Sequence, residues 1–315
     1  MARCAVLFLF GPTAVGKTEA LEDLAGRPIE VISADSMQIY RGMDIGTAKP
    51  EPALRDRIPH HLIDIRSPDE QYDVGAFVAD ANRAIGEILA RKRLPIVAGG
   101  TGFYFRHLLF GLPETPPSDD QIRERVRRKG LRLGLEAMYA ELERIDPKSA
   151  ERINPRDHYR IYRALEVYEQ TGRPLSSFET EGTARKDVDV TLRALRRDRA
   201  ELRERIARRV ESMFRAGLRG EVERLVRDGY GPGDRGMRAI GYREFFDASG
   251  ALRPATEDPL IANEITVATR RYAKRQETFF RGLPGATDVA ANAPAAIAGL
   301  VDRLCARLCG DLDSV

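Results

Sequence analysis

The chain has 315 residues, of which 43% are hydrophobic and 31% are charged, with 51 Lys and Arg against 48 Asp and Glu. This composition is typical of a globular protein with a substantial core. No apolar run reaches membrane-spanning length, and the three cysteines form neither a disulfide framework nor a zinc-binding spacing. We therefore expect a cytoplasmic protein that has no membrane partner and works as a monomer.

The first predicted strand, Cys4–Phe10, leads directly into the phosphate-binding pattern G-x-x-x-x-G-K-[ST]. The pattern consists of Gly11, Pro12, Thr13, Ala14, Val15, Gly16, Lys17 and Thr18. Its glycines let backbone N–H groups turn toward phosphate oxygens, Lys17 adds charge, and Thr18 offers a hydroxyl to Mg²⁺. A helix over Lys17–Ala25 would place its positive end at the same phosphates. A strand before the loop and a helix after it disfavour a chance glycine-rich turn, so we expect a di- or triphosphate ligand.

The rest of the N-terminal third alternates short apolar runs with helical periodicity. The predicted strands are Ile29–Ser33, His61–Ile65 and Leu94–Ala98, and a helix is predicted over Val74–Arg93. Such alternation indicates a parallel sheet with helices on both faces. Ligands of these sheets bind at the carboxyl ends of the strands, where the phosphate-binding loop lies.

A Pro-rich joint at residues 111–118 ends this pattern, and residues 119–171 are helical in pattern and rich in Arg. A strand returns at Val188–Leu195, followed by predicted helices over Glu201–Gly217, Arg219–Asp228 and Asn263–Arg281. The sequence therefore predicts an α/β fold with a P-loop parallel-sheet core flanked by helices, at residues 1–112 and 185–315. An all-helical domain at residues 113–184 is inserted into this core.

Two polar segments follow predicted strands at the edge that carries the phosphate-binding loop. Asp35 and Ser36 come after Ile29–Ser33, and Gly99-Gly100-Thr101-Gly102 follows Leu94–Ala98. A carboxylate at this edge could act on a group that reacts with a bound phosphate ester, although helix capping is the commoner use of Asp and Ser at such junctions. Thr101 could donate a hydrogen bond to a phosphate oxygen, or the segment could be a plain turn.

Two motifs of nucleotide hydrolases are missing from the sequence. No apolar strand ends in the lone Asp that anchors magnesium in these enzymes, and Asp64 is only a weak candidate. An Asn-Lys-x-Asp string, which would read guanine, is also absent. The sequence therefore disfavours a motor protein or a switch GTPase.

The segment from Asp35 to Lys49, D-S-M-Q-I-Y-R-G-M-D-I-G-T-A-K, combined with the phosphate-binding loop, resembles the tRNA dimethylallyltransferases. Five further motifs are similar and occur in the family's order: Pro59–Asp64, Gly99–Tyr104, Arg163–Glu166, Ile240–Arg243 and Thr269–Gln276. The resemblance extends from about Gly11 to Arg281. Phe279 departs from the family pattern, since Trp is frequent at its position.

The resemblance implies transfer of a dimethylallyl group from dimethylallyl diphosphate to the N6 amine of an adenine, with release of diphosphate. This adenine lies immediately 3′ of the anticodon, in tRNAs that read codons beginning with U. Lys17, the loop N–H groups and Mg²⁺ held by Thr18 suit a departing diphosphate. By family likeness Asp35 is the base that receives the amine proton, and Thr101 contacts diphosphate or keeps the reacting groups in register. Because diphosphate leaves, a second magnesium motif is not required.

The same likeness implies a set of tRNA-binding residues around an adenine extruded from the anticodon loop. Asp35, Ser36, Met37, Gln38 and Thr101 would line the nucleotide pocket. In the insertion the set contains Arg123, Tyr159, Arg160, Ile161, Tyr162 and Arg163. Further along it contains Arg238, Ala239, Ile240, Gly241, Tyr242, Arg243, Lys274, Arg275, Gln276, Glu277, Thr278, Phe279, Phe280 and Arg281. These stretches could instead be solvated helix faces, but aromatic residues between the arginines favour RNA contact.

Three alternative functions remain open from the residues alone. A kinase with the same loop would consume ATP, but it leaves the basic insertion without a role. An enzyme that prenylates free adenine nucleotides would likewise not need the insertion or the basic segment ending at Arg281. A non-catalytic RNA-binding protein would keep its function when Asp35 is replaced by Ala.

Overall fold

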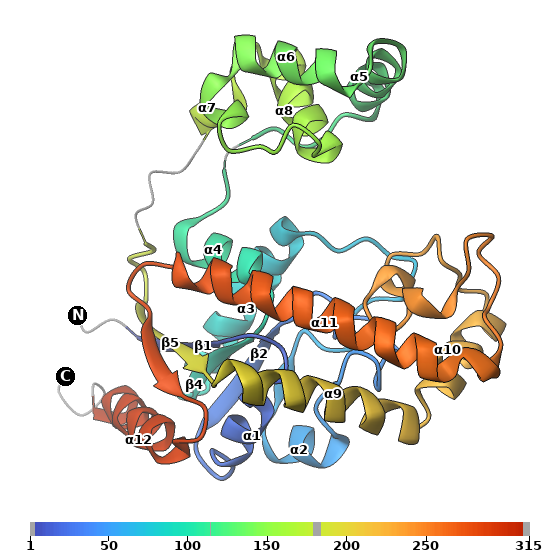
Figure 1. Cartoon of the computed structure of the whole chain (residues 1–315). Coiled ribbons are helices and arrows are strands. Elements are labelled where there is room, and N and C mark those ends of the chain that lie inside the picture. The colour runs from blue at the N-terminus through green and yellow to red at the C-terminus, as the bar shows by residue number, and fades with distance from the viewer. Residues whose placement is uncertain (1–3, 114, 179–183, 311–315) are drawn as a thin grey trace. The chain divides into compact units, whose positions relative to one another are not determined.

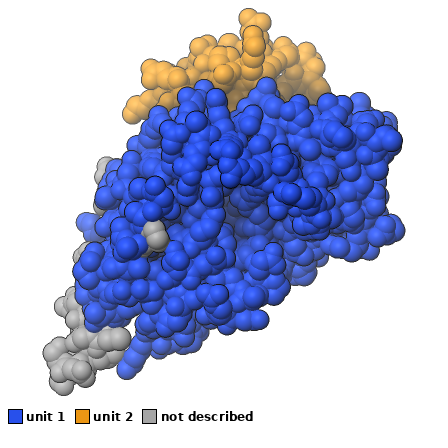
Figure 2. Space-filling model, turned by 60° about the horizontal axis from the view of Figure 1, so that its bottom comes forward, with its two compact units in different colours: residues 1–109, 186–315 blue, residues 110–185 orange. Residues whose placement is uncertain are grey.

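The computed structural model describes residues 4–113, 115–178 and 184–310, and it divides into two compact units. One unit contains residues 1–109 and 186–315, and the other contains residues 110–185 (Figure 2). Each unit has its own hydrophobic core.

The larger unit is built on a six-stranded parallel sheet with the strand order β3-β2-β4-β1-β5-β6 (Figure 1). Its strands are β1 (Ala5–Phe10), β2 (Ile29–Ala34), β3 (His60–His61), β4 (Leu94–Gly99), β5 (Asp189–Arg196) and β6 (Thr287–Ala290). Its helices are α1 (Lys17–Glu22), α2 (Pro52–Arg57), α3 (Val74–Ala90), α4 (Gly102–Phe110), α9 (Arg199–Arg215), α10 (Leu218–Arg227), α11 (Asp258–Arg281) and α12 (Pro294–Gly310). The predicted fold class, a parallel sheet flanked by helices with an added helical region, is confirmed.

Both faces of the sheet are covered because its central strands are apolar on both sides. On β1, Leu7 and Leu9 belong to a core that also contains residues of α1 and α12. Phe8 and Phe10 point the other way: Phe8 packs edge-on against Phe105 of α4, and Phe10 stacks on Phe280 of α11. Continuous apolar strands of this kind are expected where a parallel sheet lies between two helix layers.

The predicted strand His61–Ile65 is wrong in extent. Only His60 and His61 pair with β2, opposite Val31 and Ile32. Leu62 and Asp64 have φ values of 62° and 58°, a left-handed conformation that no extended strand contains. The Asp64 carboxylate accepts hydrogen bonds from Lys49 and Arg55, so this turn is fixed by ion pairs and not by sheet pairing.

The smaller unit is all-helical among its described residues. It contains α5 (Asp120–Leu133), α6 (Leu135–Ile145), α7 (Pro147–Ala150) and α8 (His158–Thr171), followed by a short 3₁₀ helix at Leu175–Phe178. Val126, Met138, Leu142, Ile161 and Leu165 form its core. Helices α5 and α8 approach closely at Gly130, where a Cβ atom would collide with the hydroxyl of Tyr162.

Candidate active site at the carboxyl edge of the sheet

The phosphate-binding loop connects β1 to α1 in the predicted way. Ala14 and Gly16 have φ values of 62° and 118°, and these left-handed residues bend the backbone around the loop. Lys17 is the first residue of α1, and its Nζ donates to the carbonyl oxygens of Gly11 and Pro12, each at 2.9 Å. The lysine side chain therefore lies across the loop, in reach of any group held by the loop amides. Helix α1 ends at Glu22, which is shorter than the predicted Lys17–Ala25.

Three arginines that the sequence analysis did not predict surround this loop. Arg197 and Arg205 donate from Nε to the carbonyl oxygens of Val15 and Ala14, each at 2.9 Å. Arg209 of α9 places Nη1 at 3.4 Å from the Thr13 hydroxyl. Nothing in the local sequence marks these residues, because only the fold brings Arg197 and the following helix α9 next to a loop 182 to 196 positions earlier.

The charges at the loop influence one another. Burial lowers the pKa of Lys17 to about 8; the negative charge of Asp35 opposes this shift and Arg209 reinforces it. Burial also lowers the pKa of Arg209, again opposed by Asp35. The charge of Asp35 thus acts on both cations.

Asp35 follows β2 and lies beside the segment that contains Thr101. The Asp35 Oδ1 accepts a hydrogen bond from the backbone N–H of Met37 at 2.9 Å, as in an Asx turn. The backbone N–H of Ser36 donates to Thr101 Oγ1 at 3.0 Å, and the backbone N–H of Thr101 donates to the Ala34 carbonyl at 3.1 Å. Within the described chain no hydrogen bond occupies Oδ2 of Asp35, so this oxygen is available to accept a proton.

The glycines beside Thr101 allow close approach of neighbouring protein. A Cβ atom at Gly99 would collide with the backbone of Ala34. At Gly100 it would collide with Nε2 of Gln276, and at Gly102 with the ring of Phe279. The Gly99–Gly102 segment is therefore enclosed between β2 and α11, and this contact with α11 fixes where Thr101 lies.

Helix α11 supplies further side chains to this edge. Tyr272 is half buried, and burial, followed by the negative charge of Asp35, raises the pKa of its hydroxyl to about 12. Tyr272 is therefore a neutral hydroxyl at physiological pH. It was not among the predicted site residues, although it lies within the Thr269–Gln276 motif.

The Gln38 amide is engaged by the protein at both ends. Its Oε1 accepts from Ser33 Oγ at 3.0 Å, and its Nε2 donates to the Ala48 carbonyl at 3.2 Å. The loop that contains Ala48 is in turn held by Glu221 of α10, a side chain that is nearly inaccessible to solvent. The Glu221 carboxylate accepts hydrogen bonds from the backbone N–H groups of three consecutive residues, Asp44, Ile45 and Gly46, and from the Tyr242 hydroxyl at 2.6 Å.

The predicted tRNA-binding residues differ widely in exposure. The exposed ones are Arg123, Tyr159, Arg160, Arg238, Arg243, Lys274, Arg275, Thr278 and Arg281. Asp35, Ser36, Met37, Gln38, Thr101, Tyr162, Arg163, Ile240, Glu277 and Phe279 are half buried. Ile161, Ala239, Gly241, Tyr242, Gln276 and Phe280 are buried.

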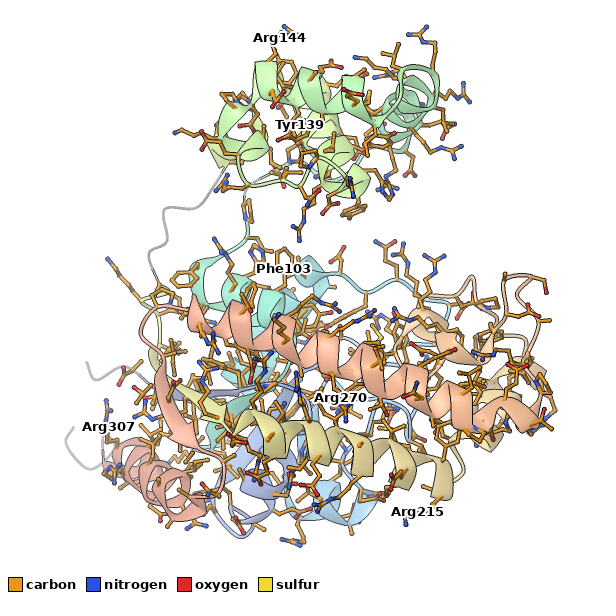
Figure 3. All side chains as sticks on the ribbon, viewed as in Figure 1. Phe103, Tyr139, Arg144, Arg215, Arg270 and Arg307 are labelled. Carbon is orange, nitrogen blue, oxygen red and sulfur yellow. The ribbon has the colours of Figure 1, made fainter. Side chains whose placement is uncertain are left out.

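Basic side chains cover the exposed face of α11, namely those of Arg270, Arg271, Lys274, Arg275 and Arg281. Figure 3 labels Arg270. In the helical unit the exposed cations are partly neutralised, since Arg123 pairs with Asp120 at 3.0 Å and Arg160 with Asp157 at 3.5 Å. Tyr159 is 74% exposed, an unusual position for an aromatic side chain. Such a ring next to arginines is available for stacking on a base.

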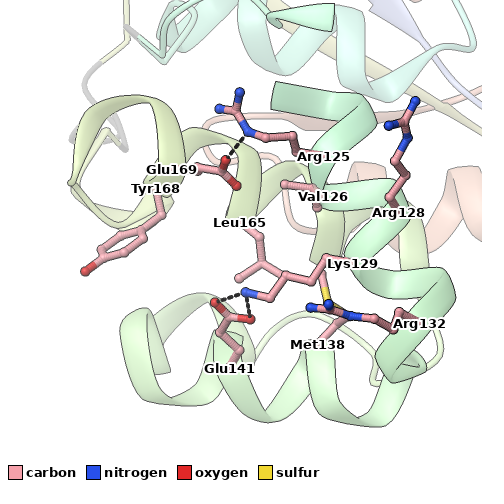
Figure 4. A pocket seen from close by; sticks show the side chains of 10 residues that line it. All are labelled: Arg125, Val126, Arg128, Lys129, Arg132, Met138, Glu141, Leu165, Tyr168 and Glu169. Atoms are coloured by element: carbon pink, nitrogen blue, oxygen red, sulfur yellow. Dashed lines mark hydrogen bonds and ion pairs between the residues drawn. The ribbon is translucent and has the colours of Figure 1, made fainter. Parts of the chain in front are cut away.

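A groove in the helical unit has a volume of about 660 Å³ and lies between α5, α6 and α8 (Figure 4). Two ion pairs cross it, Arg125 with Glu169 and Lys129 with Glu141, each at 2.7 Å. Arg128 at its rim pairs with Glu124 at 2.9 Å. Three of the four cations that line the groove, Arg125, Arg128 and Lys129, are therefore paired with carboxylates.

A parallel sheet that carries this loop after its first strand defines a P-loop α/β protein. The family model for IPP transferase matches residues 38–283. The chain is 45% identical to the tRNA dimethylallyltransferase of Acidovorax sp. (strain JS42) over 96% of its own length and 97% of that protein. The chain belongs to the IPP transferase family.

Solved structures agree with this assignment. The tRNA isopentenylpyrophosphate transferase of Bacillus halodurans is 34% identical, with a TM-score of 0.68 over 97% of this chain and 98% of that one. A eukaryotic dimethylallyltransferase acting on tRNA is 27% identical, with a TM-score of 0.77 over 91% of this chain and 74% of that one. Among the described residues, none of the helices has the length and apolar content needed to cross a membrane.

Proposed function

We propose that the chain transfers a dimethylallyl group from dimethylallyl diphosphate to the N6 amine of the adenine immediately 3′ of the anticodon, in tRNAs that read codons beginning with U. The observation that carries this proposal is the position of Asp35. Asp35 precedes Ser36, whose backbone N–H donates to Thr101 Oγ1, and the charge of its carboxylate acts on Lys17 of the phosphate-binding loop. A base and a diphosphate site would therefore lie at the same edge of the sheet, in a chain of the IPP transferase family.

The loop and its arginines suit the departure of diphosphate. An allylic C–O bond breaks readily once the charge on the leaving oxygens is neutralised, and preorganised donors provide this without reorganisation. Lys17 and Arg209 would contact the outer oxygens, and the N–H groups of the loop would contact the rest. The C–N bond to the adenine forms as the C–O bond breaks, and diphosphate is released.

The Thr18 hydroxyl, one residue beyond Lys17, would hold Mg²⁺ together with the phosphates of the substrate, as the Ser or Thr of a phosphate-binding loop does. Waters would complete the shell of this ion. Among the residues that the structure describes, no three His, Cys, Asp or Glu side chains gather as an independent metal site. Bound there, Mg²⁺ would supply positive charge to the leaving diphosphate.

Asp35 would receive the proton that the adenine amine loses. This amine is a weak nucleophile because its lone pair is delocalised into the ring, so a base that acts as the C–N bond forms lowers the barrier. Thr101 would hold the Asp35–Ser36 backbone in place, since its Oγ1 accepts from the Ser36 N–H. The adenine must leave the anticodon-loop stack to reach this site.

The exposed basic residues would bind the anticodon stem-loop. Arg238, Arg243, Lys274, Arg275 and Arg281 are exposed in the larger unit. Arg123, Tyr159 and Arg160 are exposed in the helical unit, which we propose as the tRNA-binding insertion. Phosphate contacts of this kind give a binding affinity that falls steeply with added salt. We also propose that the protein is a cytoplasmic monomer.

A transfer assay tests this function directly. Protein, Mg²⁺, labelled dimethylallyl diphosphate and unmodified tRNA are mixed under single-turnover conditions, and label in the tRNA is counted. We expect Asp35→Asn to slow transfer by about 10²- to 10⁴-fold, the usual contribution of a general base. Asp56→Asn, the same change at an exposed residue of α2, serves as the control and should react at the wild-type rate. If the wild-type protein transfers no label to tRNA, or if both variants react at equal rates, the proposal is refuted. Formation of a phosphorylated product from ATP would favour a kinase.

A further inference from the structure

Gln276 is a buried amide that joins two loops of the site. It lies on α11 with 5% of its surface exposed, while its neighbours Lys274 and Arg275 point outward. Its Oε1 accepts a hydrogen bond from the backbone N–H of Thr13 at 2.9 Å. Its Nε2 donates to the carbonyl of Gly100 at 2.7 Å. One side chain thus bonds both the phosphate-binding loop and the segment that contains Thr101.

The hydrogen bonds continue from Gly100 to Asp35. Thr101 follows Gly100 in the chain, and its Oγ1 accepts from the Ser36 N–H at 3.0 Å. The Thr101 N–H donates to the carbonyl of Ala34 at 3.1 Å, directly before Asp35. The connected groups therefore run from Thr13 through Gln276, Gly100 and Thr101 to the segment that holds Asp35. These loops follow β1, β4 and β2, three adjacent strands of the sheet.

The chemistry of the two bonds requires an amide. One partner is an N–H, which needs an acceptor, and the other is a carbonyl, which needs a donor; a glutamine offers both. Glutamate would place a second acceptor against the Gly100 carbonyl, and methionine offers neither bond. The absence of a Cβ at Gly100 is what lets Nε2 approach, because an added Cβ would collide with it. The side chain and the glycine therefore fit one another.

We propose that Gln276 is a positioning residue that sets the distance between the diphosphate cradle and the Asp35–Thr101 pair. This inference rests on the proposed function, since these loops would hold the two reacting partners. A displacement of about 1 Å between reacting groups can cost on the order of 10² in rate. Gln276 thus acts from inside α11, while the exposed residues of the same helix are the ones proposed to contact RNA.

The test compares Gln276→Met, which has a similar shape and lacks both bonds, with Gln276→Glu, which keeps only the acceptor. We expect Gln276→Met to lower the single-turnover transfer rate at saturating substrates by about 10- to 100-fold, with the Kd for tRNA changed less than about twofold. Gln276→Glu should in addition weaken binding of inorganic diphosphate, because it adds a negative charge beside the loop. Asn263→Asp makes the same amide-to-carboxylate change on the exposed part of α11 and should leave all three measurements unchanged.

A second variant keeps the test decisive if Gln276→Met folds poorly. Gly100→Ala alone disturbs the same contact from the other side, so it should lower the saturating transfer rate and leave the Kd for tRNA unchanged. Where Gln276→Met folds, the two rate penalties should not add in the double variant. Additive penalties, or a wild-type rate for Gln276→Met at saturation, would overturn the inference. A weaker tRNA Kd with an unchanged saturating rate would also overturn it, since that result marks an RNA contact. Failure of the wild-type protein to transfer the group would instead refute the proposed function.

Discussion

Replacing Glu221 by Gln should strongly destabilise the larger unit. The carboxylate is 3% exposed and accepts from Asp44, Ile45, Gly46 and Tyr242. A glutamine that keeps its oxygen toward Gly46 and Tyr242 turns its NH₂ group toward the N–H of Asp44, whose bond is lost, while the N–H of Ile45 keeps only its 3.1 Å bond to the remaining oxygen. Hydrogen bonds to a charged group contribute about 1.5–3 kcal/mol each, and bonds to a neutral amide contribute less. For one bond lost and three weakened by removal of the charge, we expect a loss of about 3 kcal/mol.

Thermal and urea unfolding of the full chain measure this loss. For a unit of this size, 3 kcal/mol corresponds to a decrease in Tm of about 6–12 °C. Tyr242→Phe removes one bond and leaves the carboxylate with its N–H partners, so it should cost about half as much. The matched control is Glu223→Gln on the same helix, because the Glu223 side chain is 40% exposed and lies 3.6 Å from Arg219. The free energy of unfolding of this variant should be within about 0.5 kcal/mol of wild type. A Glu221→Gln protein as stable as this control would refute the reasoning.

Three other predictions concern the phosphate-binding loop and the segment that contains Thr101. Arg209→Gln should weaken binding of inorganic diphosphate about tenfold or more, since a charged hydrogen bond is lost. Arg208→Gln, at the exposed neighbouring position, should change this affinity less than about twofold. Equal effects of the two substitutions in a calorimetric titration would contradict a role of Arg209 in binding diphosphate. Because the pKa of Lys17 is lowered to about 8, its charge is lost as the pH rises through that value, so wild-type affinity for diphosphate should fall there and Lys17→Met should lack this step. Gly102→Ala should slow transfer several-fold because its Cβ meets the ring of Phe279. Gly86→Ala inside α3, where space is open, should instead stabilise the protein by about 0.5–1 kcal/mol in urea unfolding. A wild-type transfer rate for Gly102→Ala, or an unchanged stability for Gly86→Ala, would contradict these expectations.

Local patterns in the sequence were sufficient to predict the sheet and its loop. The strands β1, β2, β4 and β5 lie within one residue of their predicted bounds at each end, because each is rich in apolar or β-branched residues and is followed by a polar or glycine-rich turn. The edge strand β6 was not predicted, since Thr287–Ala290 is short and largely exposed and has no apolar run. The predicted strand at His61–Ile65 failed because ion pairs of Asp64 bend the chain there.

Residues that act across long sequence separations could not be predicted in the same way. Arg209, Glu221 and Gln276 contact segments that are more than 170 positions away in the chain. By family likeness Gln276 was predicted as an RNA contact, and the structure shows that its side chain is buried while Lys274 and Arg275 are exposed. Sequence likeness identifies such a residue as part of a motif, but only the packing shows which partner it has.

The order of strands in the sheet has a consequence for synthesis of the chain. Strand β1 lies between β4 and β5, yet β5 begins at Asp189, beyond the whole helical unit. At a translation rate of about 5–20 residues per second, about 10–40 s pass between the appearance of β1 and that of β5. During this time the edge of β1 that will pair with β5 has no partner strand. The nascent chain therefore exposes an apolar edge strand while the helical unit is still being made, and this stage is when a chaperone would be of most use.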